Sequence, residues 1–300
     1  MSNVSVNKKG TIIKGIGGFY YVRDDDGQVH ECKAKGRFRN DKVIPLPGDH
    51  VHFTTSEGAY GFIEEICERR NELHRPHVAN IDQAAIVVSV QKPKADCLLC
   101  DKLIVQSKKA GILPFLVFNK CDAADDESIS SLLKEYQGVC SCVLVSAVTG
   151  EGLEDLKSHL KGRSTCFAGQ SAVGKSSILN TLFPALSLET GGLSKKTDRG
   201  RHTTRHAELL VMDDISGMVV DTPGFSFLEN ADLLPAELGF YYDDMSTYAQ
   251  NCRFTSCLHA EEPNCGVKEA VAKGLISEGR YQRYLTILKE LQEKRLHEYD

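Results

Sequence analysis

A long apolar segment is the first feature that the sequence lacks. None of its hydrophobic runs approaches the roughly 18 residues that a membrane-spanning helix needs. The start of the chain, MSNVSVNKKG, has basic residues but no apolar stretch behind them, so it does not have the pattern of a secretory signal. We therefore expect a soluble, cytoplasmic protein that does not contact a membrane.

An excess of positive charge is also missing. The 300 residues include 36 Lys and Arg and 41 Asp and Glu, which gives a formal net charge of −5. A protein with this balance is not expected to coat nucleic acid uniformly, so a polyanion would have to meet a local basic patch. Internal repeats and low-complexity tracts are absent as well, and the length favours two or three domains.

Cysteine is present, but in a pattern that does not predict disulfides. The chain has 11 cysteines, an odd number, and several lie inside apolar runs such as CSCVLV from residue 140 and CFAG from residue 166. Thiols in such runs act as small buried hydrophobic groups. We also interpret Cys97 and Cys100, in the helical stretch CLLC, as core residues. Metal binding by another subset stays open.

The first segment, from residue 10 to about 70, has short alternating runs that are broken by Gly and Asp. This pattern predicts a small barrel of about five strands, and we expect an OB-fold. Its stretch KAKGRFRNDK, residues 33–42, carries five cations and Phe38. That composition suits contact with a nucleic-acid backbone and stacking of a base on the ring, although a solvated loop explains it equally well.

The second segment, from about 71 to 228, alternates buried apolar runs with amphipathic helical stretches. Near-continuous apolar runs are typical of parallel strands that are covered on both faces, so a doubly wound, mostly parallel α/β sheet is expected. The predicted strands are 84–90, 113–118, 142–146, 165–169 and 217–221. The remainder, 229–300, has a Cys/His cluster and a final helical stretch in which Tyr284, Leu285, Leu288 and Leu291 recur at helical spacing.

A phosphate-binding loop is predicted at residues 169–176. GQSAVGKS fits G-x-x-x-x-G-K-S, follows an apolar strand and precedes a helical pattern, which is the context that the motif requires. The glycines let backbone N–H groups point at phosphate oxygens near the positive end of the helix. Lys175 is expected to reach the β and γ phosphates, and Ser176 to hold Mg²⁺.

The γ-phosphate is expected to meet two further segments. DTPG, residues 221–224, follows an apolar strand, so the carboxylate of Asp221 can hold the magnesium shell and the N–H of Gly224 can face the phosphate. The basic, glycine-rich stretch 191–209 has the composition of a mobile switch. Within it Thr204, with Thr203 in reserve, is expected to offer a hydroxyl to Mg²⁺.

Guanine is the base that the remaining motifs predict. NKCD, residues 119–122, follows a strand and fits N-K-x-D; Asp122 can accept hydrogen bonds from guanine N1 and N2, which adenine does not offer. The N–H of Ala147, in the pair Ser146–Ala147, can reach guanine O6. The predicted GTP contacts are Asn119, Lys120, Asp122, Ser146, Ala147, Gly169, Gln170, Ser171, Ala172, Val173, Gly174, Lys175, Ser176 and Ser177.

Phe225 stands where many GTPases carry the glutamine that orients the attacking water, and a phenyl ring cannot do this. We expect His202 to orient or deprotonate the water, with Lys175, Thr204 and Gly224 as its catalytic companions; a role as a basic surface residue is the alternative.

The order of these motifs indicates a circular permutation. The base-reading loop precedes the phosphate loop, which precedes DTPG, so the usual ends are joined through residues 149–164 and new ends open near 80 and 228. The termini of α/β domains often lie close together, so the sheet can keep its arrangement.

With this order the chain resembles the RsgA family, also called YjeQ or YloQ, over nearly its whole length. The resemblance rests on NKCD, SA, GQSAVGKS, GRHTT, DTPG and the Cys/His cluster. It implies a GTPase that binds the 30S subunit late in its maturation, contacts 16S rRNA and is stimulated by the subunit. It also implies that the histidine of GRHTT, His202, takes part in stimulated hydrolysis.

A zinc site is predicted at the spacing C-x4-C-x-H-x5-C, formed by Cys252, Cys257, His259 and Cys265. Three thiolates and one imidazole suit tetrahedral Zn²⁺ with no open position, so the site is expected to be structural. The resemblance agrees with this pattern.

We therefore expect an OB-fold RNA-binding domain (1–70), a circularly permuted P-loop GTPase domain (71–228) and a C-terminal α-helical zinc-binding domain (229–300). The free protein is expected to be monomeric. Two alternatives stay open: a GTP-gated RNA-binding module in which hydrolysis is incidental, and a nucleotide-dependent regulator of a protein partner.

Overall fold

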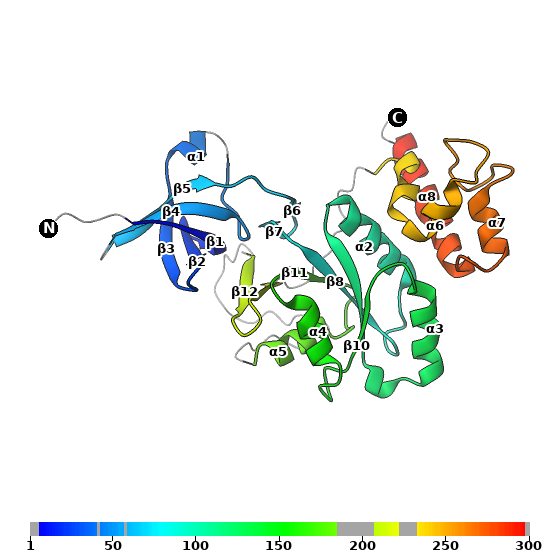
Figure 1. Ribbon diagram of the computed structural model, residues 1–300, viewed down its shortest axis with the longest axis horizontal. Coiled ribbons are helices and arrows are strands. Elements are labelled where there is room, and N and C mark those ends of the chain that lie inside the picture. Colours follow the sequence, from blue (N-terminus) through cyan, green and yellow to red (C-terminus); the bar gives the residue numbers. More distant parts are fainter. Residues whose placement is uncertain (1–5, 41–42, 57–58, 185–206, 222–232, 298–300) are drawn as a thin grey trace.

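The computed structural model describes residues 6–40, 43–56, 59–184, 207–221 and 233–297. In Figure 1 a barrel, a central α/β sheet and a cluster of helices follow one another along the long axis of the molecule. Within these ranges no helix combines the length and the apolar composition of a membrane span.

The N-terminal barrel has five strands and closes on itself. Its order is β1-β2-β3-β5-β4, and β1 also pairs with β4, which closes the ring. The strands are β1 (Val6–Ile16), β2 (Phe19–Asp24), β3 (Val29–Ala34), β4 (His50–Ser56) and β5 (Ala59–Ile66), with the short helix α1 (Arg37–Asn40) between β3 and β4. The expected OB-like barrel is confirmed.

Phe38 does not lie on the barrel surface, so the interpretation of its ring as a stacking surface was wrong. Its side chain is 8% exposed and packs in the barrel core with residues such as Ile12 and Phe53. The residue belongs to the single turn of α1, and this turn directs the ring inward. Neighbouring charges in a sequence do not show which way such a turn faces.

The central sheet alternates with helices along the chain. Its strands are β8 (Gln83–Ser89), β9 (Leu113–Asn119), β10 (Cys142–Val145), β11 (Ser164–Ala168), β12 (Glu208–Met212) and β13 (Gly217–Asp221). The helices are α2 (Cys97–Lys109), η1 (Cys121–Ala123), α3 (Asp126–Tyr136), α4 (Leu153–Leu160) and α5 (Lys175–Leu182). A small hairpin, β6 (Glu72–His74) and β7 (His77–Ala79), stands between barrel and sheet.

Strand β8 shows why the apolar runs are nearly continuous. All of its residues are buried, and successive side chains point to opposite faces of the sheet. Ile86 and Val88 pack into the core beneath α2 and α3, whereas Ala85 and Val87 pack beneath α4 and α5. A strand with helices on both sides has no face for polar residues, as predicted.

The strand order places a switch point in the middle of the sheet. The order is β10-β9-β8-β11-β13-β12, in which β12 alone runs antiparallel to its neighbour. The chain moves outward from β8 to β10 and then returns through α4 to β11, on the other side of β8. Open α/β sheets bind ligands at the carboxyl ends of the strands where the order reverses.

The barrel is joined to the sheet through its first strand. β1 pairs with β12 at Lys14 and Glu208, whose side chains also form an ion pair of 2.6 Å. A second ion pair of 2.6 Å connects Arg23 with Asp213. Barrel and sheet therefore share one continuous set of paired strands.

The C-terminal helices form their own core and pack on α2. They are η3 (Pro235–Tyr241), α6 (Asp243–Ala249), α7 (Gly266–Ala272) and α8 (Glu278–His297). Tyr284 and Leu288 of α8 are buried in this core, and Leu285 and Leu291 pack against it, as their spacing predicted. Figure 1 shows this cluster at the end of the molecule opposite the barrel.

A buried ion cluster fixes these helices to the sheet domain. Asp101 of α2, which is fully buried, accepts hydrogen bonds of 2.6 Å from both Arg280 and Arg283 of α8. Arg280 also bonds Asp244, and Arg283 also bonds Glu135 of α3. Burial alone would lower the pKa of Arg280, but the carboxylates outweigh it and raise that pKa, so the guanidinium stays charged.

Candidate functional site

The loop between β11 and α5 has the backbone of a phosphate-binding loop. Gly169 has a φ of +133° and Gly174 a φ of +101°. A Cβ atom would lie 2.2 Å from the carbonyl oxygen of Val87 at the first position and 2.2 Å from Nδ2 of Asn119 at the second. Glycine is therefore required at both positions by conformation and by space.

Lys175 is the first residue of α5 and lies along its own loop. Its ammonium group donates to the carbonyl oxygens of Gly169 at 2.7 Å and Gln170 at 2.6 Å. Burial lowers the pKa of Lys175, which means that a nearby anion would stabilise its charged form. Ser176 and Ser177 follow in the first turn, where helix N–H groups and the helix dipole attract anions.

Asn119 joins the three predicted nucleotide loops. It ends β9 and is buried; its Nδ2 donates to the carbonyl oxygen of Val173 in the phosphate loop at 2.8 Å. Its Oδ1 accepts from the backbone N–H of Ala147 at 3.2 Å. One side chain therefore holds the loops after β9, β10 and β11 together at the carboxyl edge of the sheet.

The next residues of the N-K-x-D motif lie beside this junction. Lys120 has a left-handed backbone, with a φ of +69°, and its ammonium group donates to the carbonyl oxygen of Ala172 at 2.9 Å. Asp122 lies in η1 with its side chain exposed. Through this contact of Lys120, the N-K-x-D loop packs directly against the phosphate loop.

The Ser146–Ala147 pair forms a tight turn after β10. Ser146 is buried, and its hydroxyl oxygen accepts from the N–H groups of Val148 at 3.3 Å and Thr149 at 3.1 Å. The hydroxyl of Thr181, in α5, donates to the carbonyl oxygen of Ser177 at 2.9 Å and lies 3.4 Å from that of Ala147. The turn therefore lies against the helix that follows the phosphate loop.

Of the residues predicted to contact the γ-phosphate or its magnesium ion from the two switch segments, only Asp221 lies within the described ranges. Asp221 ends β13, which runs parallel to β11, so its backbone lies at the same edge of the sheet. His202, Thr203, Thr204, Gly224 and Phe225 lie outside the described residues.

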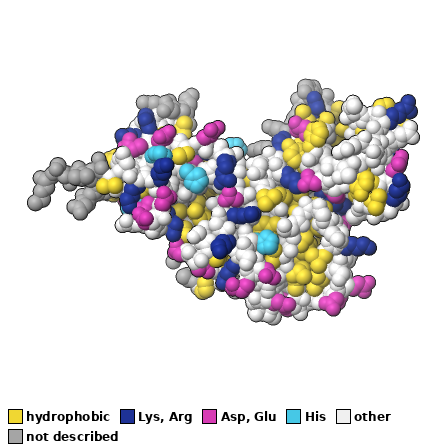
Figure 2. Space-filling model, viewed as in Figure 1, with side chains coloured by type: hydrophobic (Ala, Val, Ile, Leu, Met, Phe, Trp, Pro, Cys, Tyr) yellow, Lys and Arg dark blue, Asp and Glu magenta, His cyan; other side chains and the backbone are white. Residues whose placement is uncertain are grey.

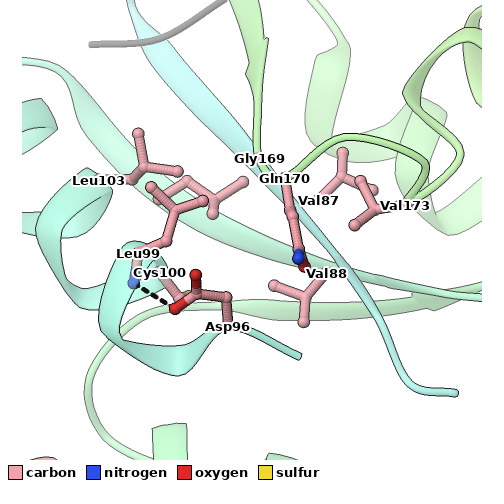
Figure 3. A pocket seen from close by; sticks show the side chains of 10 residues that line it. Val87, Val88, Asp96, Leu99, Cys100, Leu103, Gly169, Gln170 and Val173 are labelled. Atoms are coloured by element: carbon pink, nitrogen blue, oxygen red, sulfur yellow. Dashed lines mark hydrogen bonds between the residues drawn. The ribbon is translucent and has the colours of Figure 1, made fainter. Parts of the chain in front are cut away.

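A small cavity lies between the phosphate loop and α2. It has a volume of about 10 Å³ and is lined by residues that include Gly169, Gln170, Val173 and Leu99. Figure 3 shows the side chain of Gln170 reaching past Val87 towards Val88 and Asp96. The amide oxygen of Gln170 is buried and has no hydrogen-bond partner among the described residues. A cavity of this size is just large enough for one water molecule.

The Cys/His cluster of the C-terminal domain has the geometry of a closed metal site. The ligand atoms of Cys252, Cys257, His259 and Cys265 all lie within 4.8 Å of one another. Nδ1 of His259 lies 3.5 Å from the sulfur of Cys252 and 3.4 Å from that of Cys265, and the two sulfurs are 3.8 Å apart. Tetrahedral zinc with ordinary bond lengths requires edges of about 3.8 Å between sulfurs and about 3.5 Å between sulfur and nitrogen, so these three distances match the ion, and Cys257 supplies a fourth donor within 4.8 Å.

The surroundings of the cluster hold its ligands in place. The hydroxyl of Tyr281 donates to the carbonyl oxygen of His259 at 2.7 Å, and that of Tyr284 donates to Leu258 at 2.9 Å. Burial raises the pKa of Cys257 to about 12 and lowers that of His259. A cation must therefore displace a thiol proton, while the imidazole is already neutral and able to bind it.

Sequence reasoning did not identify the Asp101 cluster. The available signal was a carboxylate inside the apolar helical stretch of α2, together with two arginines three residues apart on α8. No motif relates these residues, because 179 positions separate Asp101 from Arg280.

Fold and loops together define a P-loop GTPase whose sheet is circularly permuted and flanked by an OB-like barrel and a Cys/His domain. The family description "RsgA GTPase" matches residues 66–231, and "RsgA N-terminal domain" matches residues 9–63. The chain belongs to the RsgA family of GTPases.

Relatives of nearly equal length support this assignment. The small ribosomal subunit biogenesis GTPase RsgA of Caldanaerobacter subterraneus subsp. tengcongensis is 46% identical over 97% of this chain and 98% of its own. That of Geobacillus thermodenitrificans is 45% identical over 96% and 98%.

Solved structures agree. The crystal structure of YjeQ from Thermotoga maritima matches with a TM-score of 0.84 and 37% identity, covering 96% of this chain and 99% of that one. The structure of YloQ, a circularly permuted GTPase, matches with a TM-score of 0.83 and 35% identity, covering 96% of each chain.

Proposed function

We propose that this chain is a ribosome-associated GTPase that hydrolyses GTP to GDP and phosphate, is stimulated by the small ribosomal subunit and acts in the late maturation of that subunit. The names of its relatives support the biological role. The observation that carries the site is the double hydrogen bond of Asn119, because it joins the base-reading loops and the phosphate loop into one surface.

The described residues have distinct parts in this proposal. Asp122 accepts hydrogen bonds from guanine, and the N–H of Ala147 faces O6. The phosphate loop surrounds the phosphates, and Lys175 moves its ammonium group from the carbonyl oxygens of its own loop to the β and γ phosphate oxygens. Burial disfavours the charge of Lys175 and lowers its pKa, and phosphate oxygens beside the ammonium group would stabilise that charge.

Magnesium belongs to the same proposal, with Ser176, Thr204 and Asp221 as the residues that would hold it. When bound, it neutralises charge that develops on the phosphate oxygens. Gly224 would donate its N–H to the γ-phosphate, and His202 would orient the attacking water in place of the glutamine that Phe225 replaces. Binding of the subunit would bring His202 into position, which accounts for stimulation.

We further propose three functional domains with boundaries at 1–70, 71–228 and 229–300. The barrel and the C-terminal domain contact 16S rRNA. Zinc held by the Cys/His cluster stabilises the C-terminal domain for its contact. Figure 2 shows cationic and anionic side chains interspersed over the face drawn, so RNA contact is expected at local patches. The free protein is proposed to be a cytoplasmic monomer.

The deciding experiment is hydrolysis of GTP and of ATP with and without purified 30S subunits. We expect slow GTP turnover, a large rise on adding subunits and little turnover of ATP. Binding to subunits without any rise in turnover would contradict the enzyme and favour a GTP-gated RNA-binding module. A chain that does not bind subunits would contradict the ribosomal role altogether. Metal analysis of the purified protein should find about one zinc per chain.

A further inference from the structure

The outer face of the barrel carries aromatic rings around a single lysine. Phe19 of β2, Lys33 of β3 and Phe62 of β5 lie opposite one another in the strand register, so they form one row across three strands. Tyr60 lies two residues before Phe62 on β5, and its ring lies against Phe19 and Lys33, which places it on this face. We call these four residues the aromatic face.

Two of the rings are exposed, and the third, Phe19, is half-buried beside Tyr60. The rings of Phe19 and Tyr60 have centroids 4.9 Å apart, and the side chains of Tyr60 and Phe62 are 46% and 45% exposed. Rings of this size usually contribute to a core, so their presence on one solvent-facing surface indicates a surface that binds a partner.

The charge of Lys33 is held among these rings. Its ammonium nitrogen lies 4.7 Å from the ring centroid of Phe19 and 4.5 Å from that of Tyr60. Across the described ranges of the chain, no carboxylate pairs with Lys33, whereas its neighbour Lys35 is bonded to Glu64. The rings thus hold the cation in position without neutralising it. The face is therefore complementary to a ligand in which a negatively charged group lies next to a planar ring.

We propose that the aromatic face binds an unpaired segment of RNA, with bases stacked on Tyr60 and Phe62 and a phosphate at Lys33. A nucleotide supplies both the flat ring and the adjacent negative charge, and OB-folds bind oligonucleotides on the face that contains strands 2 and 3. The proposal deepens the RNA contact proposed above and rests on it. It also replaces Phe38, whose ring is inside the barrel.

The test measures binding of a labelled oligouridine of about 12 nucleotides, within the site sizes of OB-folds, to the zinc-loaded full chain by fluorescence anisotropy. We expect Tyr60→Ala and Phe62→Ala each to weaken binding about tenfold, since each removes one stacking ring. Tyr60→Phe keeps the ring and should bind as the wild type does. Lys33→Gln should reduce the dependence of binding on salt. Val29→Ala, an exposed apolar change on β3, is the matched control.

The outcomes separate this proposal from the function on which it rests. Equal affinity of the wild type and both alanine variants for the oligouridine would overturn the aromatic face. The proposal would also be overturned if the two alanine variants lost affinity for a blunt RNA duplex by the same factor as for the oligouridine, because a duplex offers no unpaired base. Failure of the wild type to bind oligouridine while it still binds 30S subunits would overturn the face and leave the ribosomal role intact. If a variant unfolds, cross-linking of bromouridine RNA to the wild type decides: cross-links to β2 or β5 support the face, and cross-links found elsewhere contradict it.

Discussion

Replacing Asn119 with alanine tests whether the loops after β9, β10 and β11 form one site. The side chain is buried and makes two hydrogen bonds, one to the carbonyl oxygen of Val173 and one from the N–H of Ala147. Alanine removes both and leaves each backbone partner unsatisfied. It also leaves a space beside Gly174, where the Asn119 amide now occupies the position that a Cβ atom would need.

The size of the effect follows from these two bonds. A buried backbone group that loses its partner costs about 1–3 kcal/mol. Because the N–H of Ala147 lies nearer the surface than the carbonyl of Val173, we expect a total of about 2–4 kcal/mol. This free energy corresponds to a fall of about 30-fold to several hundredfold in the protection of the loop amides against hydrogen exchange.

Hydrogen exchange with mass spectrometry measures the protection of these loop amides peptide by peptide. The experiment uses the zinc-loaded protein without nucleotide. Peptides that cover residues 145–150 and 168–176 should lose protection in Asn119→Ala, and GTP affinity should fall at least tenfold. Asn119→Asp keeps the acceptor for Ala147 but not the donor to Val173, so its main loss should be in the phosphate loop. Asn7→Ala, an exposed change on β1, should alter neither. Unchanged protection and unchanged GTP affinity in Asn119→Ala would refute the reasoning.

Further predictions concern other parts of the molecule. Equimolar ATP should not displace bound GTP; if it does, the role of Asp122 is wrong. His202→Ala should keep GTP affinity and lose most subunit-stimulated turnover, and unaltered turnover would remove it from the mechanism. Asp101→Asn removes the buried carboxylate that Arg280 and Arg283 share, leaving buried Arg280 with Asp244 alone, and should lower the free energy of unfolding in urea by about 3 kcal/mol, whereas Lys102→Gln, which breaks a partly exposed pair, should change it by less than about 1 kcal/mol. Burial would raise the pKa of Asp24, but bonds from Lys8, His30 and the backbone outweigh it and hold that pKa well below its ordinary 3.8. The stability from Asp24 is therefore present above about pH 4 and lost as the pH falls further, and acid titration of Asp24→Asn should lack this loss.

The predicted elements were largely correct where their cause is local. The run AAIVVSV became β8, and the α8 residues Tyr284 and Leu288 became core, because hydrophobic periodicity is a property of neighbouring residues. The phosphate loop followed for the same reason: its glycines, its lysine and the flanking strand and helix are contiguous. The predicted zinc ligands are likewise close in sequence, and the structure brings their ligand atoms within 4.8 Å of one another.

Sequence by itself thus determined the parallel strands of the central sheet, the final helix, the motif loops and their permuted order, since each depends on a few adjacent residues. Only the tertiary structure decided that Phe38 faces inward, that Phe19, Lys33, Tyr60 and Phe62 share a face, and that β1 pairs with β12. It also decided that Asp101 meets Arg280 from 179 positions away. The physical reason is that these contacts form between finished elements, whose packing depends on the shape and burial of the whole chain and leaves no periodic signal in any one segment.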